Sequence, residues 1–114
     1  MSEFQPVANL ADLPEGTLLP VKNAAGEAIC LANVDGTVAA MVDCCSHAEF
    51  ALSDGVIHAD GTVECVWHGA RFDCATGAAC KGPAVDPVAT YEVRVADGKI
   101  FVGPRKTAGA EMAR

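Results

Sequence analysis

Residues 91–102 read YEVRVADGKIFV, and this stretch predicts a β-hairpin. Tyr91, Val93 and Val95 alternate with charged residues, which is the period of a strand with one face buried. The Asp-Gly pair that follows is a preferred two-residue turn between antiparallel strands, because Asp and Gly both tolerate a left-handed backbone. The end of the chain is therefore expected to form two paired strands.

Two further turns of this kind precede the hairpin, NVDG at 33–36 and ADG at 59–61, and a CATG turn lies at 74–77. Apolar or β-branched segments flank them, as expected of short strands. These segments are EAICLANV at 27–34, TVAAMV at 37–42, TVECVW at 62–67, and the short pieces 71–73 and 78–80. Short strands joined by frequent turns predict an all-β protein, an antiparallel sandwich or barrel.

The chain has 114 residues, which fits one compact domain, expected here over residues 1–102. Only residues 8–16 have the pattern of a helical turn, with Asn9 as its cap. Residues 103–114 carry Gly, Ala and charge without strand patterning, so a flexible tail is expected there.

The composition excludes several classes of partner. The net charge is −7 and no run of Lys or Arg is present, which argues against nucleic acid. Neither an export signal nor an apolar segment of membrane-spanning length is apparent, so we expect a cytoplasmic protein that does not bind membranes. A reducing cytoplasm makes disulfides an unlikely use for six cysteines, and metal binding is the better explanation for some of them.

Two short cysteine and histidine pairs stand out, Cys45 with His47 and Cys65 with His68. Thiolate and imidazole are ligands of borderline and soft transition metals, so the pairs suggest one metal centre between two loops. A tetrahedral zinc site can use the same four ligands. The order Cys, His, Cys, His differs from that of zinc fingers, and it suits a two-iron cluster with both cysteines on one iron and both histidines on the other.

The pattern C-x-H, 17 residues, C-x-x-H resembles the signature of Rieske [2Fe-2S] proteins. The surrounding residues are similar to the small Rieske ferredoxins of bacterial dioxygenase systems that hydroxylate aromatic rings. The similar stretches are LSDG at 52–55, HGARFD at 68–73, TG at 76–77, GPA at 82–84 and the hairpin at 91–102. The resemblance implies the Rieske fold, in which two loops form a small cluster-binding subdomain at about residues 43–84. It also implies one cluster held by Cys45, His47, Cys65 and His68.

The remaining cysteines and the third histidine are given structural roles. Only Cys45 has a histidine two residues later, so Cys44 is the spare member of its pair. Cys44 is interpreted as a small buried hydrophobic residue, and so are Cys30, Cys74 and Cys80. His58, beside the ADG turn, is expected at the surface.

Comparison with the high-potential Rieske proteins of respiratory complexes predicts a low potential. Those proteins have Ser and Tyr at the positions of Ala70 and Phe72, which lack a hydroxyl donor here. They also have a disulfide at the positions of Phe50 and Trp67, where none can form. Both differences favour the low end of the Rieske range, about −150 mV.

The resemblance implies a one-electron carrier between a reductase and a terminal oxygenase, and not an enzyme. A monomer is expected, with transient docking at the tip that carries the histidine ligands. Trp67 is expected to pack beneath the cluster loop. Further residues are expected either beside the cluster or on the docking surface, with Pro83 covering the cluster. They are Ala48, Glu49, Phe50, Gly69, Ala70, Phe72 and the segment 81–84.

Two alternatives remain open at this point. The chain could be the small Rieske-like subunit of an assimilatory nitrite reductase. It could also belong to a different class, a structural zinc module whose metal only fixes the fold.

Overall fold

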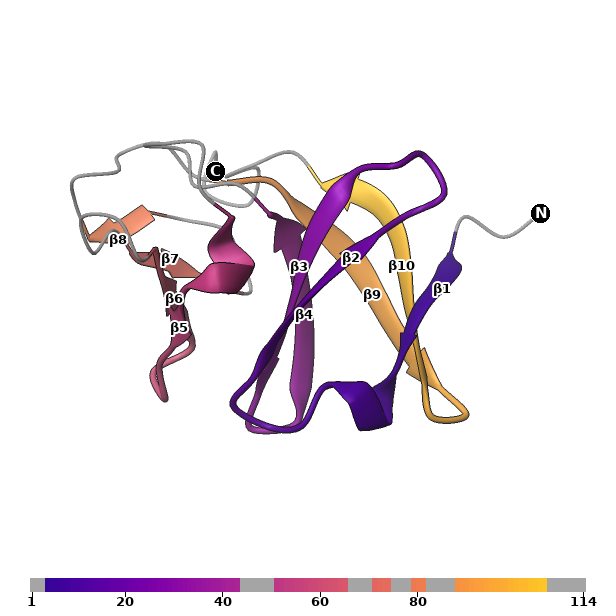
Figure 1. The fold of residues 1–114 in the computed structure, drawn as a ribbon, viewed down its shortest axis with the longest axis horizontal. Coiled ribbons are helices and arrows are strands. Elements are labelled where there is room, and N and C mark those ends of the chain that lie inside the picture. Colours follow the sequence, from indigo (N-terminus) through magenta and orange to yellow (C-terminus); the bar gives the residue numbers. More distant parts are fainter. Residues whose placement is uncertain (1–3, 44–50, 66–70, 75–78, 82–87, 107–114) are drawn as a thin grey trace.

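The computed structural model describes residues 4–43, 51–65, 71–74, 79–81 and 88–106, which form two antiparallel sheets (Figure 1). The larger sheet has six strands in the order β1-β10-β9-β4-β3-β2, and the smaller has four in the order β5-β6-β7-β8. The predicted all-β fold with an added small subdomain is confirmed.

The larger sheet is built from both ends of the chain. Its strands are β1 (Gln5–Asn9), β2 (Leu18–Lys22), β3 (Ala28–Val34), β4 (Thr37–Val42), β9 (Thr90–Ala96) and β10 (Lys99–Lys106). Strands β4 and β9 are neighbours, with Ala40 opposite Tyr91 and Met41 opposite Thr90. The chain between them, residues 43–89, is therefore an insertion whose two ends lie side by side.

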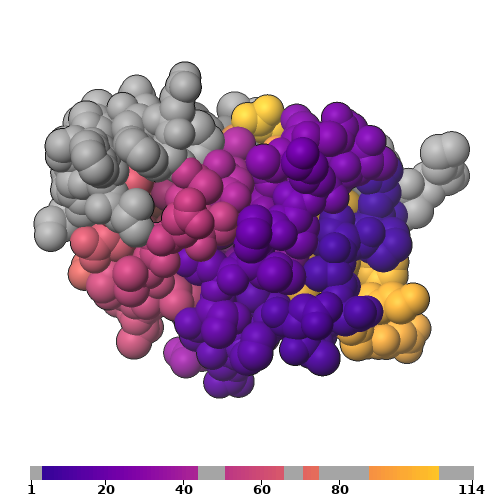
Figure 2. All heavy atoms as spheres, viewed as in Figure 1, coloured from indigo at the N-terminus to yellow at the C-terminus, as the bar shows by residue number. Residues whose placement is uncertain are grey.

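The smaller sheet belongs to this insertion. Its strands are β5 (Val56–Ile57), β6 (Thr62–Glu64), β7 (Arg71–Asp73) and β8 (Ala79–Lys81), and a 3-10 turn at Leu52–Asp54 precedes them. In the space-filling view, the smaller sheet lies directly beside the larger one (Figure 2).

Strand β3 contributes to two cores, one on each of its faces. Ile29 and Leu31 pack inside the larger sheet with a cluster that includes Leu13, Tyr91 and Ile100. Cys30 and Ala32 point to the other face and pack with residues of the insertion. These four residues in the middle of β3 are all fully buried, which explains why the strand reads as a continuous apolar run and not as an alternation.

The hairpin predictions are confirmed. Asp35 and Asp97 have positive φ angles of 52° and 54°, and the glycine after each is also left-handed, as a two-residue Asp-Gly turn requires. The ADG turn at 59–61 joins β5 to β6, with Ile57 opposite Val63. The CATG turn itself lies outside the described residues, although β7 and β8 on either side of it are paired.

Other expectations needed correction. Strands β1 and β2 were not predicted; each is short and contains a proline, which is tolerated because both are edge strands. Strand β10 continues to Lys106, beyond the boundary expected at residue 102. A register shift between Val102 and Arg105 accommodates Gly103 and Pro104 without ending the strand.

The predicted helical turn is a 3-10 turn at Leu10–Asp12. Asn9 occupies its cap position, but its side chain makes no capping hydrogen bond. Among the described residues, no helix is long and apolar enough to cross a membrane.

Candidate metal centre

Cys65 is the one predicted ligand that falls within the described residues. It follows the last residue of β6 directly, and its side chain is fully buried. Cys45, His47 and His68 lie outside the described residues, and the described residues alone contain no group of three potential metal ligands. We call residues 44–50 the first ligand segment and residues 65–70 the second.

The residues that flank the two ligand segments pack in a single core. Met41 precedes the first segment and Leu52 follows it, while Cys65 begins the second and Phe72 follows it. All four side chains are fully buried and belong to one cluster of packed residues. Such a core, with the thiol of Cys65 in it, fits an iron–sulfur cluster, which needs shielding from water.

Asp43 and Ser53 join the two ends of the first ligand segment. The Ser53 backbone N–H and hydroxyl donate to the two carboxylate oxygens of Asp43, each at 2.7 Å. The Asp43 N–H in turn donates to the carbonyl of Ala28 on β3, at 3.1 Å. This arrangement fixes the base of the first segment to the larger sheet.

Gly55 allows β5 to pass close to β6 just before the second ligand segment. A Cβ atom at Gly55 would overlap the backbone carbonyl of Glu64, the residue before Cys65, and would lie 3.0 Å from the carbonyl of Leu52. The φ angle of Gly55 is −87°, so the requirement is for space and not for a left-handed conformation. Glycine is therefore needed beside the position that presents Cys65.

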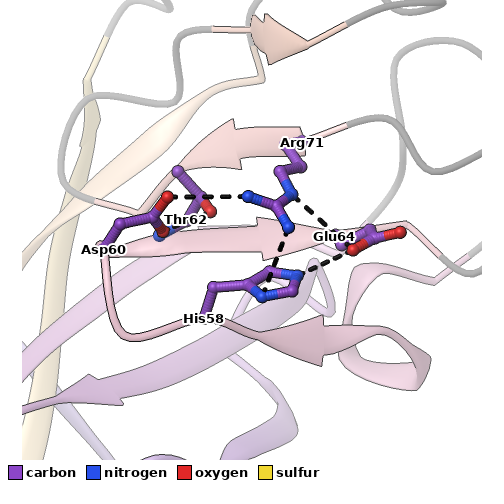
Figure 3. A network of polar contacts seen from close by, with 5 residues as sticks. All are labelled: His58, Asp60, Thr62, Glu64 and Arg71. Atoms are coloured by element: carbon purple, nitrogen blue, oxygen red, sulfur yellow. Dashed lines mark hydrogen bonds and ion pairs between the residues drawn. The ribbon is translucent and has the colours of Figure 1, made fainter.

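A polar network spans the base of the second ligand segment (Figure 3). The His58 Nε2 atom lies 2.7 Å from Glu64 Oε1, and Arg71 Nη2 lies 3.4 Å from His58 Nδ1. Arg71 also lies 3.6 Å from both Glu64 Oε1 and Asp60 Oδ2. His58 is 28% exposed, so it lies partly at the surface as expected, but both of its ring nitrogens are held by partners.

Asp60 is held at the edge of this network by Thr62. The Thr62 hydroxyl and backbone N–H donate to Asp60 Oδ1 at 2.7 and 3.1 Å. These two hydrogen bonds, with smaller contributions from Arg71 and His58, lower the pKa of the Asp60 carboxyl. The network thus contains two carboxylates and one guanidinium.

Two of the other cysteines have the structural role expected of them. Cys30 and Cys74 are both buried in the core that also contains Cys65. Burial raises the pKa of the Cys30 thiol, with a further contribution from nearby Asp43 and Cys74. Such a thiol is a poor nucleophile and a poor ligand. Cys44 and the side chain of Cys80 lie outside the described residues.

Phe72 was expected either beside the cluster or on the docking surface, and the structure excludes the second role. Its ring is fully buried in the same core as Cys65. The remaining residues expected near the cluster lie outside the described residues, and these are Ala48, Glu49, Phe50, Trp67, Gly69, Ala70 and Pro83.

Sequence reasoning missed Asp43, Ser53 and the network around Arg71. One signal was available for the network: Thr62 and Glu64 alternate within an expected strand, so they share one of its faces, and Asp60 lies in the turn just before them. Nothing in the sequence indicated that Arg71 would pair opposite Glu64, because this depends on the register of β6 and β7.

Comparison with known proteins agrees with this arrangement. The family model of the Rieske [2Fe-2S] domain matches residues 3–92. The 3-phenylpropionate/cinnamic acid dioxygenase ferredoxin subunit of Escherichia coli (strain K12) is 43% identical over 93 residues, which cover 82% of this chain and 86% of that protein.

Solved structures give the same result. The ferredoxin of carbazole 1,9a-dioxygenase from Nocardioides aromaticivorans IC177 superposes with a TM-score of 0.84 at 36% identity, covering 90% of this chain and 99% of that chain. A chain in the complex of reduced oxygenase and oxidized ferredoxin in carbazole 1,9a-dioxygenase superposes with a TM-score of 0.84 at 26% identity, covering 94% and 98%. These similarities do not support a nitrite reductase subunit or a zinc module.

Proposed function

The chain belongs to the family of Rieske [2Fe-2S] domain proteins, and we propose that Cys45 and Cys65 hold one iron of its cluster while His47 and His68 hold the other. Support comes from Cys65, a buried cysteine at the end of β6 beside the flanks of both ligand segments. The alternation of cysteine and histidine in both segments supports the same assignment.

The protein is an electron-transfer ferredoxin of an aromatic-ring dioxygenase system and not itself an enzyme. The similarity to dioxygenase ferredoxins over most of the chain is the observation that carries this conclusion. It passes electrons to a terminal oxygenase.

When bound, the cluster supplies one-electron redox chemistry. The protein's own contribution is to position the ligands and to exclude water from them. The described side chains around Cys65 include Leu52, Val63 and Phe72, all fully buried. These side chains carry no hydroxyl, and Ala70 and Phe72 stand where high-potential Rieske proteins have Ser and Tyr, so we infer a potential near the low end of the Rieske range, about −150 mV.

The partners dock at the tip formed by the histidine ligands, with Glu49, Phe50, Gly69, Ala70 and Pro83 around them. A reductase supplies the electron at this same surface. Because one partner must leave before the other can dock, each contact is small and transient. Electron-transfer interfaces commonly bury less than about 1,200 Å². The protein is a monomer in the cytoplasm.

Absorption and EPR spectroscopy of paired cysteine variants test the ligand assignment. Wild-type protein should be red-brown, bleach with dithionite, and give a rhombic signal with an average g value below that of clusters with four cysteine ligands. Cys45→Ser should remove this signal, while its neighbour Cys44→Ser should keep it. The proposal is wrong if Cys44→Ser loses the cluster and Cys45→Ser retains it. Cys65→Ser and its control Cys74→Ser repeat the comparison in the second segment.

Reconstitution tests the function. Adding the protein to a reductase and a terminal oxygenase of the 3-phenylpropionate type should restore NADH-dependent product formation that the two components lack alone. The Cys45→Ser variant is the control. A protein that carries the cluster but never increases product formation with such components would contradict the assignment to dioxygenase systems.

A further inference from the structure

Arg71 is the centre of the polar network, and its position relates it to the second ligand segment. It is the first residue of β7, and it lies opposite Glu64, the last residue of β6. Glu64 precedes Cys65, and Arg71 comes three residues after His68. A contact between Glu64 and Arg71 therefore joins the two ends of the second ligand segment, which carries Cys65 and His68.

Arg71 contacts three residues at once. Its Nη2 atom lies 3.4 Å from His58 Nδ1, and its Nη1 atom lies 3.6 Å from Asp60 Oδ2. Its Nε atom lies 3.6 Å from Glu64 Oε1, and this buried atom makes no hydrogen bond to any other described residue. The guanidinium therefore links β7 to the loop after β5 and to the end of β6 (Figure 3).

The contacts of His58 define its tautomer. A guanidinium can only donate, so His58 Nδ1 must accept from Arg71. In the neutral ring the proton then resides on Nε2, which donates to Glu64 Oε1 at 2.7 Å. In this tautomer His58 bridges Arg71 and Glu64, since it accepts a hydrogen bond from the guanidinium and donates one to the carboxylate.

The network contains more acidic than permanently basic side chains. Asp60 and Glu64 are acidic, and Arg71 carries the one permanent positive charge among the five labelled residues (Figure 3). The side chains of Arg71 and Glu64 are only 29% and 31% exposed, so solvent screens them incompletely. Arg71 follows His68 by three positions in the chain, so their Cα atoms can be at most about 11 Å apart.

We propose that Arg71 is a positioning residue for the second ligand segment, and that its positive charge makes the iron–sulfur centre easier to reduce. This inference rests on the proposed ligand set. Reduction adds a negative charge, which a nearby cation favours and a nearby carboxylate disfavours. Arg71 and Glu64 therefore affect the reduction potential in opposite directions, although both support the same structure.

Four variants separate charge from structure. Arg71→Gln removes the cation, Arg71→Lys keeps the charge but loses the planar fork, and Glu64→Gln removes the anion with little change in shape. Arg94→Gln is the matched control, since Arg94 is an exposed cation on β9 that lies 4.4 Å from the centre of the Phe4 ring. It changes the net charge of the protein by the same amount as Arg71→Gln.

The readouts are the reduction potential by mediated titration and the rate at which a chelator removes iron. Arg71→Gln should lower the equilibrium constant for reduction by roughly three- to tenfold, and Glu64→Gln should raise it. Arg71→Lys should keep the wild-type potential. Both Arg71 variants should lose iron several times faster than the wild-type protein, and Arg94→Gln should match the wild type in both measurements.

Opposite shifts in Arg71→Gln and Glu64→Gln support a role of charge, because loosening of the segment alone would shift both in one direction. If Arg71→Gln folds but does not retain its cluster, while Arg71→Lys does retain it, the positioning role is supported. The inference is overturned if Arg71→Gln and Arg94→Gln have the same potential and the same rate of iron loss. A wild-type protein without the Rieske EPR signal would instead overturn the proposed ligand set.

Discussion

The carboxylate of Asp43 accepts both hydrogen bonds that Ser53 can donate, one from its backbone and one from its hydroxyl, at 2.7 Å each. The residues are ten positions apart, and the first ligand segment lies between them. Two charge-assisted hydrogen bonds at this point restrict the segment at both ends.

Removing this contact should destabilise the protein and speed the loss of iron. Ser53→Ala removes one hydrogen bond to a charged acceptor and should cost about 1.5 kcal/mol, and Asp43→Ala should cost about 3 kcal/mol. Urea denaturation and iron release to a chelator are the measurements. Asp54→Ala, which removes an exposed carboxylate next to Ser53, should change neither. Equal effects of Asp43→Ala and Asp54→Ala would show that the contact contributes nothing.

Replacing Gly55 should destabilise the insertion through a steric clash. The new Cβ would overlap the Glu64 carbonyl, so β5 or β6 must shift, and Gly55→Ala should cost about 2 to 3 kcal/mol. Gly26→Ala is the control, because Gly26 has a φ angle of 83° and open space around it. Its cost should be about 1 kcal/mol, from the left-handed backbone alone. Thermal denaturation compares the two, and a larger loss in Gly26→Ala would contradict this account.

The buried thiol of Cys30 predicts a loss of stability in alkali. Its pKa in the folded protein is raised above the ordinary value of 9.0, so above pH 9 the unfolded chain releases a proton that the folded chain retains. This contribution is complete below pH 9 and declines as the pH rises, by about 1.4 kcal/mol per pH unit.

Urea denaturation between pH 8 and pH 10.5 measures this slope. Cys30→Ala should begin less stable because of its cavity, but its stability should fall less steeply with pH than that of the wild-type protein. Parallel slopes would mean that Cys30 does not contribute to the alkaline transition.

Adding a hydroxyl near the cluster should raise the reduction potential. Phe72→Tyr places a hydrogen-bond donor on a ring that is buried with Cys65. Ala70→Ser adds a hydroxyl two residues earlier in the chain, where the high-potential Rieske proteins have Ser. Donation to a cluster sulfur or a thiolate stabilises the reduced form, by an amount on the order of tens of mV. Voltammetry gives the result, with Phe101→Tyr on β10 as the control. A potential unchanged in both variants would contradict this explanation of the low potential.

The sequence predicted the features that depend on local chemistry. The hairpins at Asp35 and Asp97 were predictable because an Asp-Gly pair permits few other conformations. Strands β1 and β2 were not, since Pro6 and Pro20 contradict a strand unless its position at a sheet edge is known.

The candidate site shows the same division. The four proposed ligands are recognisable from residue type and spacing alone. The contacts of Asp43 with Ser53 and of Arg71 with Glu64 join residues ten and seven positions apart. They depend on how the chain turns back between those residues, and spacing does not encode this. The partners of His58 were missed for the same reason.

The side-by-side position of Met41 and Thr90 has a consequence for protein engineering. A short turn could replace residues 43–89 and leave every hydrogen-bonded strand pair of the larger sheet intact. The truncated sheet would nevertheless expose Cys30, Ala32 and Met41, which the insertion now covers. The truncated protein would keep the strand pairs of the larger sheet, but it would tend to self-associate through the newly exposed apolar face. Redesigning it as a standalone scaffold would first require polar side chains at these three positions.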